Sequence, residues 1–169
     1  MDDIVKAALK KWPNVPHCYG WLALDARGDW YMRDERIQRA GPFPAVKGSR
    51  ITHEKLLQFI ERNYLDEGGA WFFQNGPQRV YVELEAAPWV WRLHGERVVS
   101  HTGLATEAEA CWIDEHDRLF LGTALGLGIV HSLDMLDAAT QVEQGRWTPE
   151  PIEHAALLRR YGVELAPQP

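Results

Sequence analysis

Apolar residues recur at helical spacing in two stretches of the N-terminal half, and this spacing predicts two helices. Residues 53–64 form one of these stretches, and Thr52 stands where it can cap the helix. Residues 2–12 form the other. Its apolar face consists of Ile4, Val5, Ala8, Leu9 and Trp12.

The C-terminal third predicts two further helices. Ser132 is placed to cap the first, after a glycine-rich link over residues 126–128. Pro149 and Pro151 open the second, and Gly162 is placed to end it as a left-handed cap.

Alternating apolar and polar positions predict β-hairpins between these helices. One hairpin covers residues 19–33 and is followed by a loop over 34–50, while another covers residues 110–123. Residues 69–102 read as a meander with strands at 70–74, 79–86, 89–94 and 96–102. Asn75-Gly76 is typical of a two-residue turn, but Pro77 would then lack an N–H in the ladder, so we expect a longer loop from Asn75 to Gln78.

The first and last hairpins align at an offset of 89 residues. Asp25 falls on Asp114 and Tyr31 on Phe120. After a link that is shorter in the second copy, the offset becomes 79, so that Leu57 falls on Leu136. We interpret this as an internal repeat of hairpin, link and capped helix, in which neither copy buries its apolar face alone.

These elements predict an α+β fold in which mostly antiparallel β-hairpins pack with three to four helices. We expect one globular domain over residues 1–165, with a disordered tail at 166–169. Its parts are the repeat units at about 19–64 and 108–140 and the meander at 69–102.

Four segments carry a resemblance to known families. They are Asp25 to Tyr31, Ile51 to Leu57, Gly69 to Phe72 and Val80 to Trp89. Over about residues 19–138 the chain resembles uncharacterised bacterial domain-of-unknown-function families with repeated hairpin-and-helix motifs. The resemblance implies the same fold, and it favours a role in signalling or ligand sensing. The chain departs from the pattern from Trp147 onward.

Composition excludes several classes of protein. The net charge of −6 opposes binding to phosphate backbones, so we expect no nucleic-acid partner. No apolar run is long enough for a membrane span, and the N-terminus lacks the features of a secretory signal, so we expect a cytoplasmic protein without a membrane partner. Cys18 and Cys111 have no metal or redox spacing, and we expect two buried thiols.

Motifs for cofactors and covalent catalysis are absent from the sequence. Gly126-x-Gly128 is too short for a dinucleotide fingerprint, no phosphate-binding loop exists, and Gly48-Ser49-Arg50 lacks the surroundings of a nucleophile elbow. The seven histidines have no metal-like spacing. Glu83 and Glu85 share one face of a strand, which is more typical of a solvated face than of an acid and base pair. We therefore expect no cofactor and no metal.

Aromatic rings beside directional polar groups suggest a pocket on the meander. The candidate ligand-binding residues are Trp71, Asn75, Gln78, Arg79, Tyr81, Trp91, Arg92 and His101. The hypothesis is a binding or sensory module for a small ligand or a protein partner. The alternatives are a hydrolase-like enzyme that uses carboxylates or histidine assembled by the fold, and a structural subunit of a complex.

Overall fold

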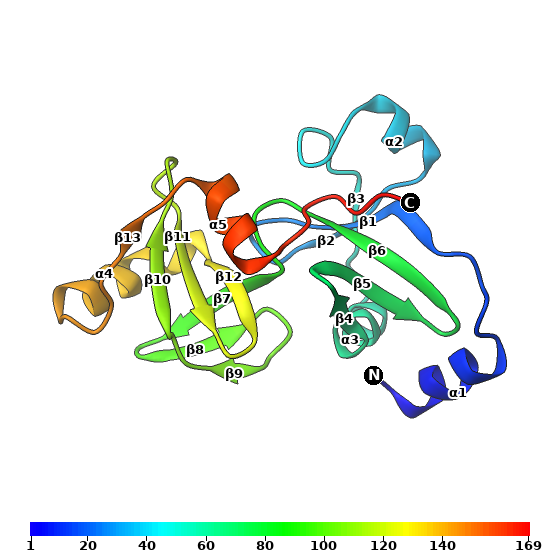
Figure 1. Cartoon of the computed structure of the whole chain (residues 1–169), viewed down its shortest axis with the longest axis horizontal. Coiled ribbons are helices and arrows are strands. Elements are labelled where there is room, and N and C mark those ends of the chain that lie inside the picture. Colours follow the sequence, from blue (N-terminus) through cyan, green and yellow to red (C-terminus); the bar gives the residue numbers. More distant parts are fainter. The chain divides into compact units, whose positions relative to one another are not determined.

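The computed structural model describes all residues from Met1 to Pro169 (Figure 1). It confirms the α+β class. It has five α-helices, whereas we expected three to four. They are α1 (Asp3–Lys11), α2 (Glu35–Ala40), α3 (Glu54–Arg62), α4 (Met135–Glu143) and α5 (His154–Tyr161). A single 3₁₀ turn, η1 (Ser132–Asp134), precedes α4. None of the helices has the length and apolar character needed to cross a membrane.

The first sheet has six strands in the order β3-β2-β1-β6-β5-β4. Neighbouring strands are antiparallel except β1 and β6, which are parallel. The strands are β1 (Cys18–Leu24), β2 (Trp30–Met32), β3 (Ser49–Arg50), β4 (Tyr64–Glu67), β5 (Ala70–Asn75) and β6 (Gln78–Leu84).

The second sheet has seven strands in the order β13-β10-β11-β12-β7-β8-β9. Two of its pairs are parallel, β10 with β13 and β12 with β7. The strands are β7 (Trp89–His94), β8 (Arg97–Ser100), β9 (Ala105–Thr106), β10 (Ala110–Ile113), β11 (Leu119–Thr123), β12 (Gly126–Val130) and β13 (Glu150–Pro151).

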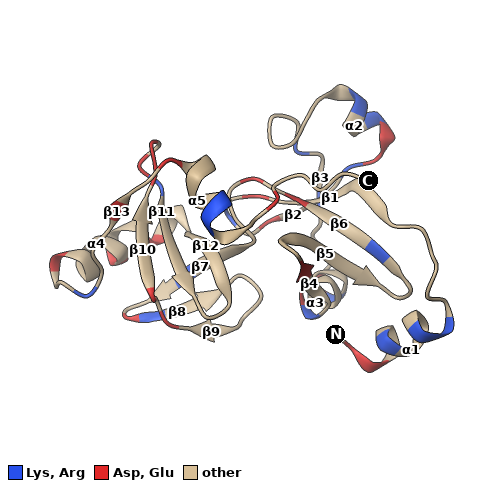
Figure 2. Cartoon of the chain, in the orientation of Figure 1, with Lys and Arg blue, Asp and Glu red and all other residues tan.

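The chain divides into two compact units, each built on one sheet. Unit 1 comprises Met1–Asp25, Asp29–Glu85 and Glu164–Pro169, and unit 2 comprises Ala26–Gly28 and Ala86–Val163. The predicted meander is therefore divided, because β6 belongs to the first sheet and β7 to the second. In both units acidic and basic residues are interspersed, as Figure 2 shows.

The internal repeat is confirmed by the strand order. In the first sheet β3-β2-β1-β6 has the same order and directions as β12-β11-β10-β13 in the second. The registers also agree, since Tyr31 pairs with Ala23 and Phe120 pairs with Trp112 at the predicted offset. Each copy therefore closes with a strand parallel to the first strand of its hairpin.

The hairpin turns of the two copies have one geometry. The Asp25 N–H donates to the Asp29 carbonyl at 3.0 Å, and the Asp29 N–H donates to the Asp25 carboxylate at 2.9 Å. The same two bonds join Asp114 and Arg118, at 3.1 and 2.8 Å. The aspartates are buried in both copies. Their carboxylates accept backbone N–H groups that have no backbone partner within the turn.

The alignment of the helices needs a correction of one residue. His53 and His131, rather than the predicted Thr52 and Ser132, cap the two helical segments, and in both the imidazole Nδ1 accepts a backbone N–H. This pairing shifts the offset by one, so that buried Ile60 corresponds to buried Ala138. Leu136, which we expected to match Leu57, is instead 85% exposed.

Three local expectations were wrong. The loop over 34–50 contains α2, a short helix capped by the Asp34 carboxylate through the Ile37 N–H. Asn75 pairs directly with Gln78, so the turn has only two residues and Pro77 lies in the turn rather than in the ladder. The glycine-rich link is strand β12.

The packing of two tryptophans explains why glycine occurs inside β12. A Cβ at Gly128 would overlap the Trp91 ring and would lie 2.8 Å from Trp89 Cβ. Only glycine allows these rings to lie directly on the strand. A pattern read along the chain cannot reveal this, because the rings come from β7.

Candidate functional site

Arg79 and Tyr81 of β6 lie together on one face of the first sheet. The Arg79 guanidinium lies 3.9 Å from the Phe72 ring centroid, and it bonds to the Glu67 carboxylate and the Tyr81 hydroxyl. The Tyr81 ring stacks on Tyr19 with centroids 4.7 Å apart. One guanidinium nitrogen of Arg79 makes both of these bonds, and the rings around it form a half-buried aromatic surface.

The other three candidates of unit 1 have separate environments. Trp71 is buried and packs on Tyr64 with centroids 4.8 Å apart. Asn75 lies at the end of β5, and Gln78 donates to the Pro16 carbonyl at 3.2 Å. Trp71 is thus part of the core beneath the sheet.

The remaining three candidates belong to unit 2. Trp91 is fully buried and donates from Nε1 to the Leu121 carbonyl at 3.1 Å. Arg92 binds the Asp134 carboxylate through two nitrogens at 2.7 and 3.3 Å. His101 accepts the Val90 N–H through Nδ1 at 3.1 Å. The eight candidates are therefore divided between the two sheets.

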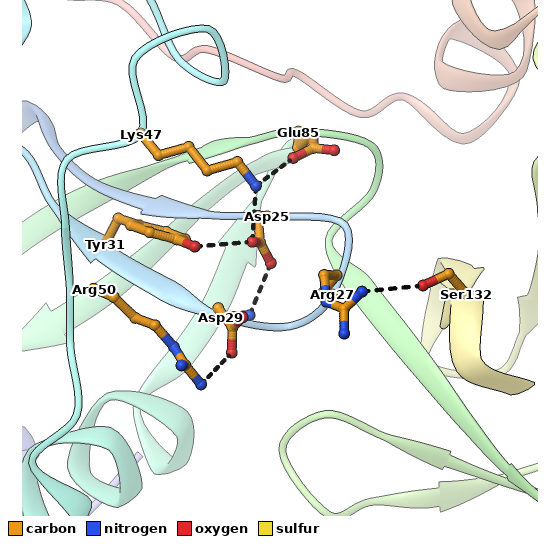
Figure 3. A network of polar contacts seen from close by, with 8 residues as sticks. All are labelled: Asp25, Arg27, Asp29, Tyr31, Lys47, Arg50, Glu85 and Ser132. Atoms are coloured by element: carbon orange, nitrogen blue, oxygen red, sulfur yellow. Dashed lines mark hydrogen bonds and ion pairs between the residues drawn. The ribbon is translucent and has the colours of Figure 1, made fainter.

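A polar network surrounds Asp25 at the turn of the first hairpin (Figure 3). Lys47 Nζ lies 2.9 Å from the Asp25 carboxylate and 3.3 Å from that of Glu85. The Tyr31 hydroxyl donates to Asp25 at 3.2 Å. Burial opposes the charge of Lys47, but the hydrogen bond and charge of Asp25 and the charge of Glu85 outweigh it and raise the pKa of Lys47 above its ordinary value.

This network is better suited to structure than to catalysis. A protonated Lys47 between two carboxylates is neither a base nor a nucleophile near neutral pH. Burial and the neighbouring Asp25 also raise the pKa of Tyr31. In the second copy Arg118 supplies the corresponding cation from within the turn, at 2.8 Å from Asp114. Lys47 thus holds the segment between β2 and β3, which contains α2, against the first sheet.

An apolar hollow lies against α3 in unit 1. It has a volume of about 220 Å³, and its lining includes Trp21, Met32 and Leu56, which are 38%, 50% and 37% exposed. Pockets for small molecules usually measure roughly 300–1,000 Å³. The hollow is therefore smaller than a typical small-molecule site.

A larger hollow in unit 2 surrounds Trp147, and we call it the Trp147 hollow. Its volume is about 360 Å³, and its lining includes Glu109, Trp112, Arg146, Trp147, Glu150 and Arg160. A neighbouring hollow of about 530 Å³ shares Arg146 and Trp147 with it. Trp147 thus lines two hollows within the usual size range.

The polar groups of the Trp147 hollow come from several elements. Arg146 follows α4 and is ion-paired with Glu96, and Arg160 lies at the end of α5. The Arg160 guanidinium lies 4.5 Å from the ring centroid of Trp112, which belongs to β10. Sequence reasoning missed this site. The only signal was an isolated tryptophan in the polar segment Gly145-Arg146-Trp147-Thr148.

Both cysteines are free, and Cys111 is buried as expected whereas Cys18 is only half-buried. Burial raises the pKa of Cys111, which lines the Trp147 hollow, to about 11, and burial also raises the pKa of Cys18. A thiol with such a pKa is a poor nucleophile at neutral pH. No three metal-ligating side chains are grouped anywhere in the chain. The groups of the Trp147 hollow that can contact a ligand are instead its tryptophans, its arginines and its glutamates.

The fold and site define a repeat protein of the α+β class with a candidate ligand hollow in unit 2. The chain belongs to the family described as protein of unknown function (DUF2946), whose model matches residues 1–168. No curated protein matches the sequence.

Two solved structures resemble the chain. A DUF1285 family protein from Silicibacter pomeroyi DSS-3 aligns with a TM-score of 0.50 and 11% identity over 82% of this chain and 83% of that chain. A DUF1285 family protein from Shewanella baltica OS155 aligns with a TM-score of 0.44 and 15% identity over 72% of this chain and 91% of that chain. The first likeness supports a shared fold and nothing further.

Proposed function

We propose that this protein is a non-enzymatic binding module whose ligand is a small molecule held in the Trp147 hollow. The observation that carries the proposal is the placement of Trp147 and Arg160 around one hollow of about 360 Å³. A ring face with a few directional polar groups is the usual composition of a small-molecule site. A more specific version of this proposal is that the protein senses its ligand as part of signalling.

The ionisable groups favour binding over the hydrolase alternative. Burial raises the pKa of the Cys111 thiol to about 11, and no histidine lines the Trp147 hollow. Lys47, Asp25 and Glu85 are ion-paired with one another in unit 1. A hydrolase needs a nucleophile or a base within hydrogen-bond reach of the substrate, and binding needs only the contacts that the hollow offers.

A thermal-shift screen of metabolites on the wild type and on Trp147→Ala tests the proposal. A ligand at ~100 times its Kd stabilises the folded state by about 2.7 kcal/mol, which raises the melting temperature by several degrees. We expect such a ligand to stabilise the wild type and to lose its effect on Trp147→Ala.

Trp12→Ala is the matched control, because Trp12 is 51% exposed, caps the C-terminus of α1 and does not line the hollow. It should keep the response of the wild type. The proposal is wrong if every stabilising compound acts equally on Trp147→Ala, or if no compound in a broad set has an effect.

A further inference from the structure

Arg160 is the uncommitted cation of the Trp147 hollow. The other arginine of the lining, Arg146, bonds to the carboxylate of Glu96 and to the Gln141 side chain at 3.0 Å. Arg160 has no ion pair and no hydrogen bond. Its guanidinium makes a cation–π contact with the Trp112 ring. Its guanidinium therefore keeps all its N–H donors for a ligand.

The surface beneath Arg160 is fixed by the fold. Trp112 Nε1 donates to the Tyr161 hydroxyl at 3.2 Å, and this hydroxyl would lie only 2.0 Å from a Cβ at residue 122. Gly122 thus allows α5 to approach β11 closely. His154, at the start of α5, is held by the Glu115 carboxylate and the Ala86 carbonyl, each at 2.8 Å. Arg160 consequently extends from an anchored helix over an oriented ring.

Two carboxylates of the same lining are also uncommitted. Glu109 precedes β10 and Glu150 belongs to β13, and neither has an ion pair. The free charges of the hollow are therefore one guanidinium and two carboxylates. A complementary ligand carries one anionic group and two cationic groups around a body that stacks on Trp147.

We propose that the ligand of the Trp147 hollow is a basic α-amino acid with a planar cationic side chain. This inference rests on the proposed function. The ligand carboxylate binds Arg160, its α-ammonium and side-chain cation bind Glu109 and Glu150, and its planar group stacks on Trp147. Arginine and carboxylate form bidentate, charge-assisted bonds, and planar cations stack on indole rings.

Calorimetric titration with L-arginine tests the inference, with two matched probes. L-Argininamide lacks the carboxylate, and L-citrulline keeps the planar shape without the side-chain charge. We expect both to bind at least about tenfold more weakly than L-arginine, because each loses a charge-assisted contact. Arg160→Met should weaken L-arginine by a similar factor and should remove the difference between L-arginine and L-argininamide.

Arg159→Met is the control variant, because Arg159 precedes Arg160 on α5 but does not line the hollow. It should bind L-arginine as the wild type does. The inference is wrong if L-arginine and L-argininamide bind equally, or if Arg160→Met changes nothing. If L-arginine fails to bind but another compound stabilises the protein through Trp147, the inference falls and the proposed function stands. If no compound acts through Trp147, both fall.

Discussion

Asp25 and Asp114 occupy equivalent positions in two copies of one motif. Each donates its N–H to the carbonyl of the residue four positions later and accepts that residue's N–H with its carboxylate. The copies differ in the cation that each aspartate binds. Asp25 binds Lys47 from a distant connection, and Asp114 binds Arg118 from its own turn.

Asp114→Asn should destabilise the protein by about 1–3 kcal/mol, because it removes the charge that holds Arg118 and weakens the bonds to two backbone N–H groups. Burial opposes the charge of Asp114, yet the hydrogen bonds and charge of Arg118 lower its pKa. The stabilisation is therefore present above the unfolded pKa of about 3.9 and is lost as the pH falls through the folded pKa. Denaturant titrations across the acid range measure it.

Asp117→Asn is the control for this variant. Asp117 lies in the same turn with a φ of 58°, a conformation that asparagine tolerates, and its side chain makes no hydrogen bond. It should remain near wild-type stability. Equal losses in the two variants would contradict the role given to Asp114.

Lys47→Met should cost about 1–3 kcal/mol at neutral pH, because buried Asp25 loses its cation. The pKa of Lys47 is raised in the folded state. Its contribution is therefore complete below the ordinary lysine value of 10.5 and is lost as the pH rises through the folded pKa. The difference between the wild type and Lys47→Met should shrink above about pH 10.5 in denaturant titrations.

Lys55→Met, on the exposed surface of α3, is a suitable comparison because Lys55 has no ion pair. We expect a change within about 0.5 kcal/mol. A loss at Lys55 as large as that at Lys47 would show that the Asp25 network has no special role.

Gly128→Ala should destabilise the protein by about 1–3 kcal/mol, because the new Cβ overlaps the Trp91 ring. Trp91→Phe should recover part of this loss in the double variant, since the smaller ring leaves room beside β12. A double-mutant cycle from thermal unfolding measures the coupling. Strict additivity of the two changes would refute the packing explanation.

Ile60→Ala in unit 1 and Leu157→Ala in unit 2 should each cost about 2–5 kcal/mol, because both side chains are fully or almost fully buried. We predict one cooperative transition for both variants, as expected for a single domain. The reason is that unit 2 includes Ala26–Gly28 of the first hairpin, while unit 1 includes the C-terminal Glu164–Pro169.

Leu136→Ala provides the control, because Leu136 is 85% exposed. It should change the free energy of unfolding by less than about 0.5 kcal/mol. Calorimetry distinguishes the outcomes for the buried variants. Two separate transitions, each shifted by only one of the buried variants, would show that the two units unfold independently.

The sequence by itself determined the two hairpin turns at Asp25 and Asp114 and the repeat of the hairpin. Asp25 and Asp114 specify their turns through bonds to a residue four positions away, so a few neighbouring residues contain the information. The offset of 89 residues between the two hairpins was predicted correctly for the same reason, because each hairpin is specified by residues close together in the sequence. The helix alignment failed by one residue, because amphipathic spacing alone did not separate exposed Leu136 from the buried face.

Only the tertiary structure decided which strands pair across long separations and which residues form the candidate site. The parallel pairs β1–β6 and β10–β13 join segments far apart in the chain. The division of the meander between two sheets follows from that pairing, and no local pattern contains it. Trp112, Trp147 and Arg160 likewise come from three segments, and α5 brings Arg160 over Trp112 because Gly122 leaves room for Tyr161. Such a site depends on packing between elements, whereas periodicity reports only which face of each element is buried.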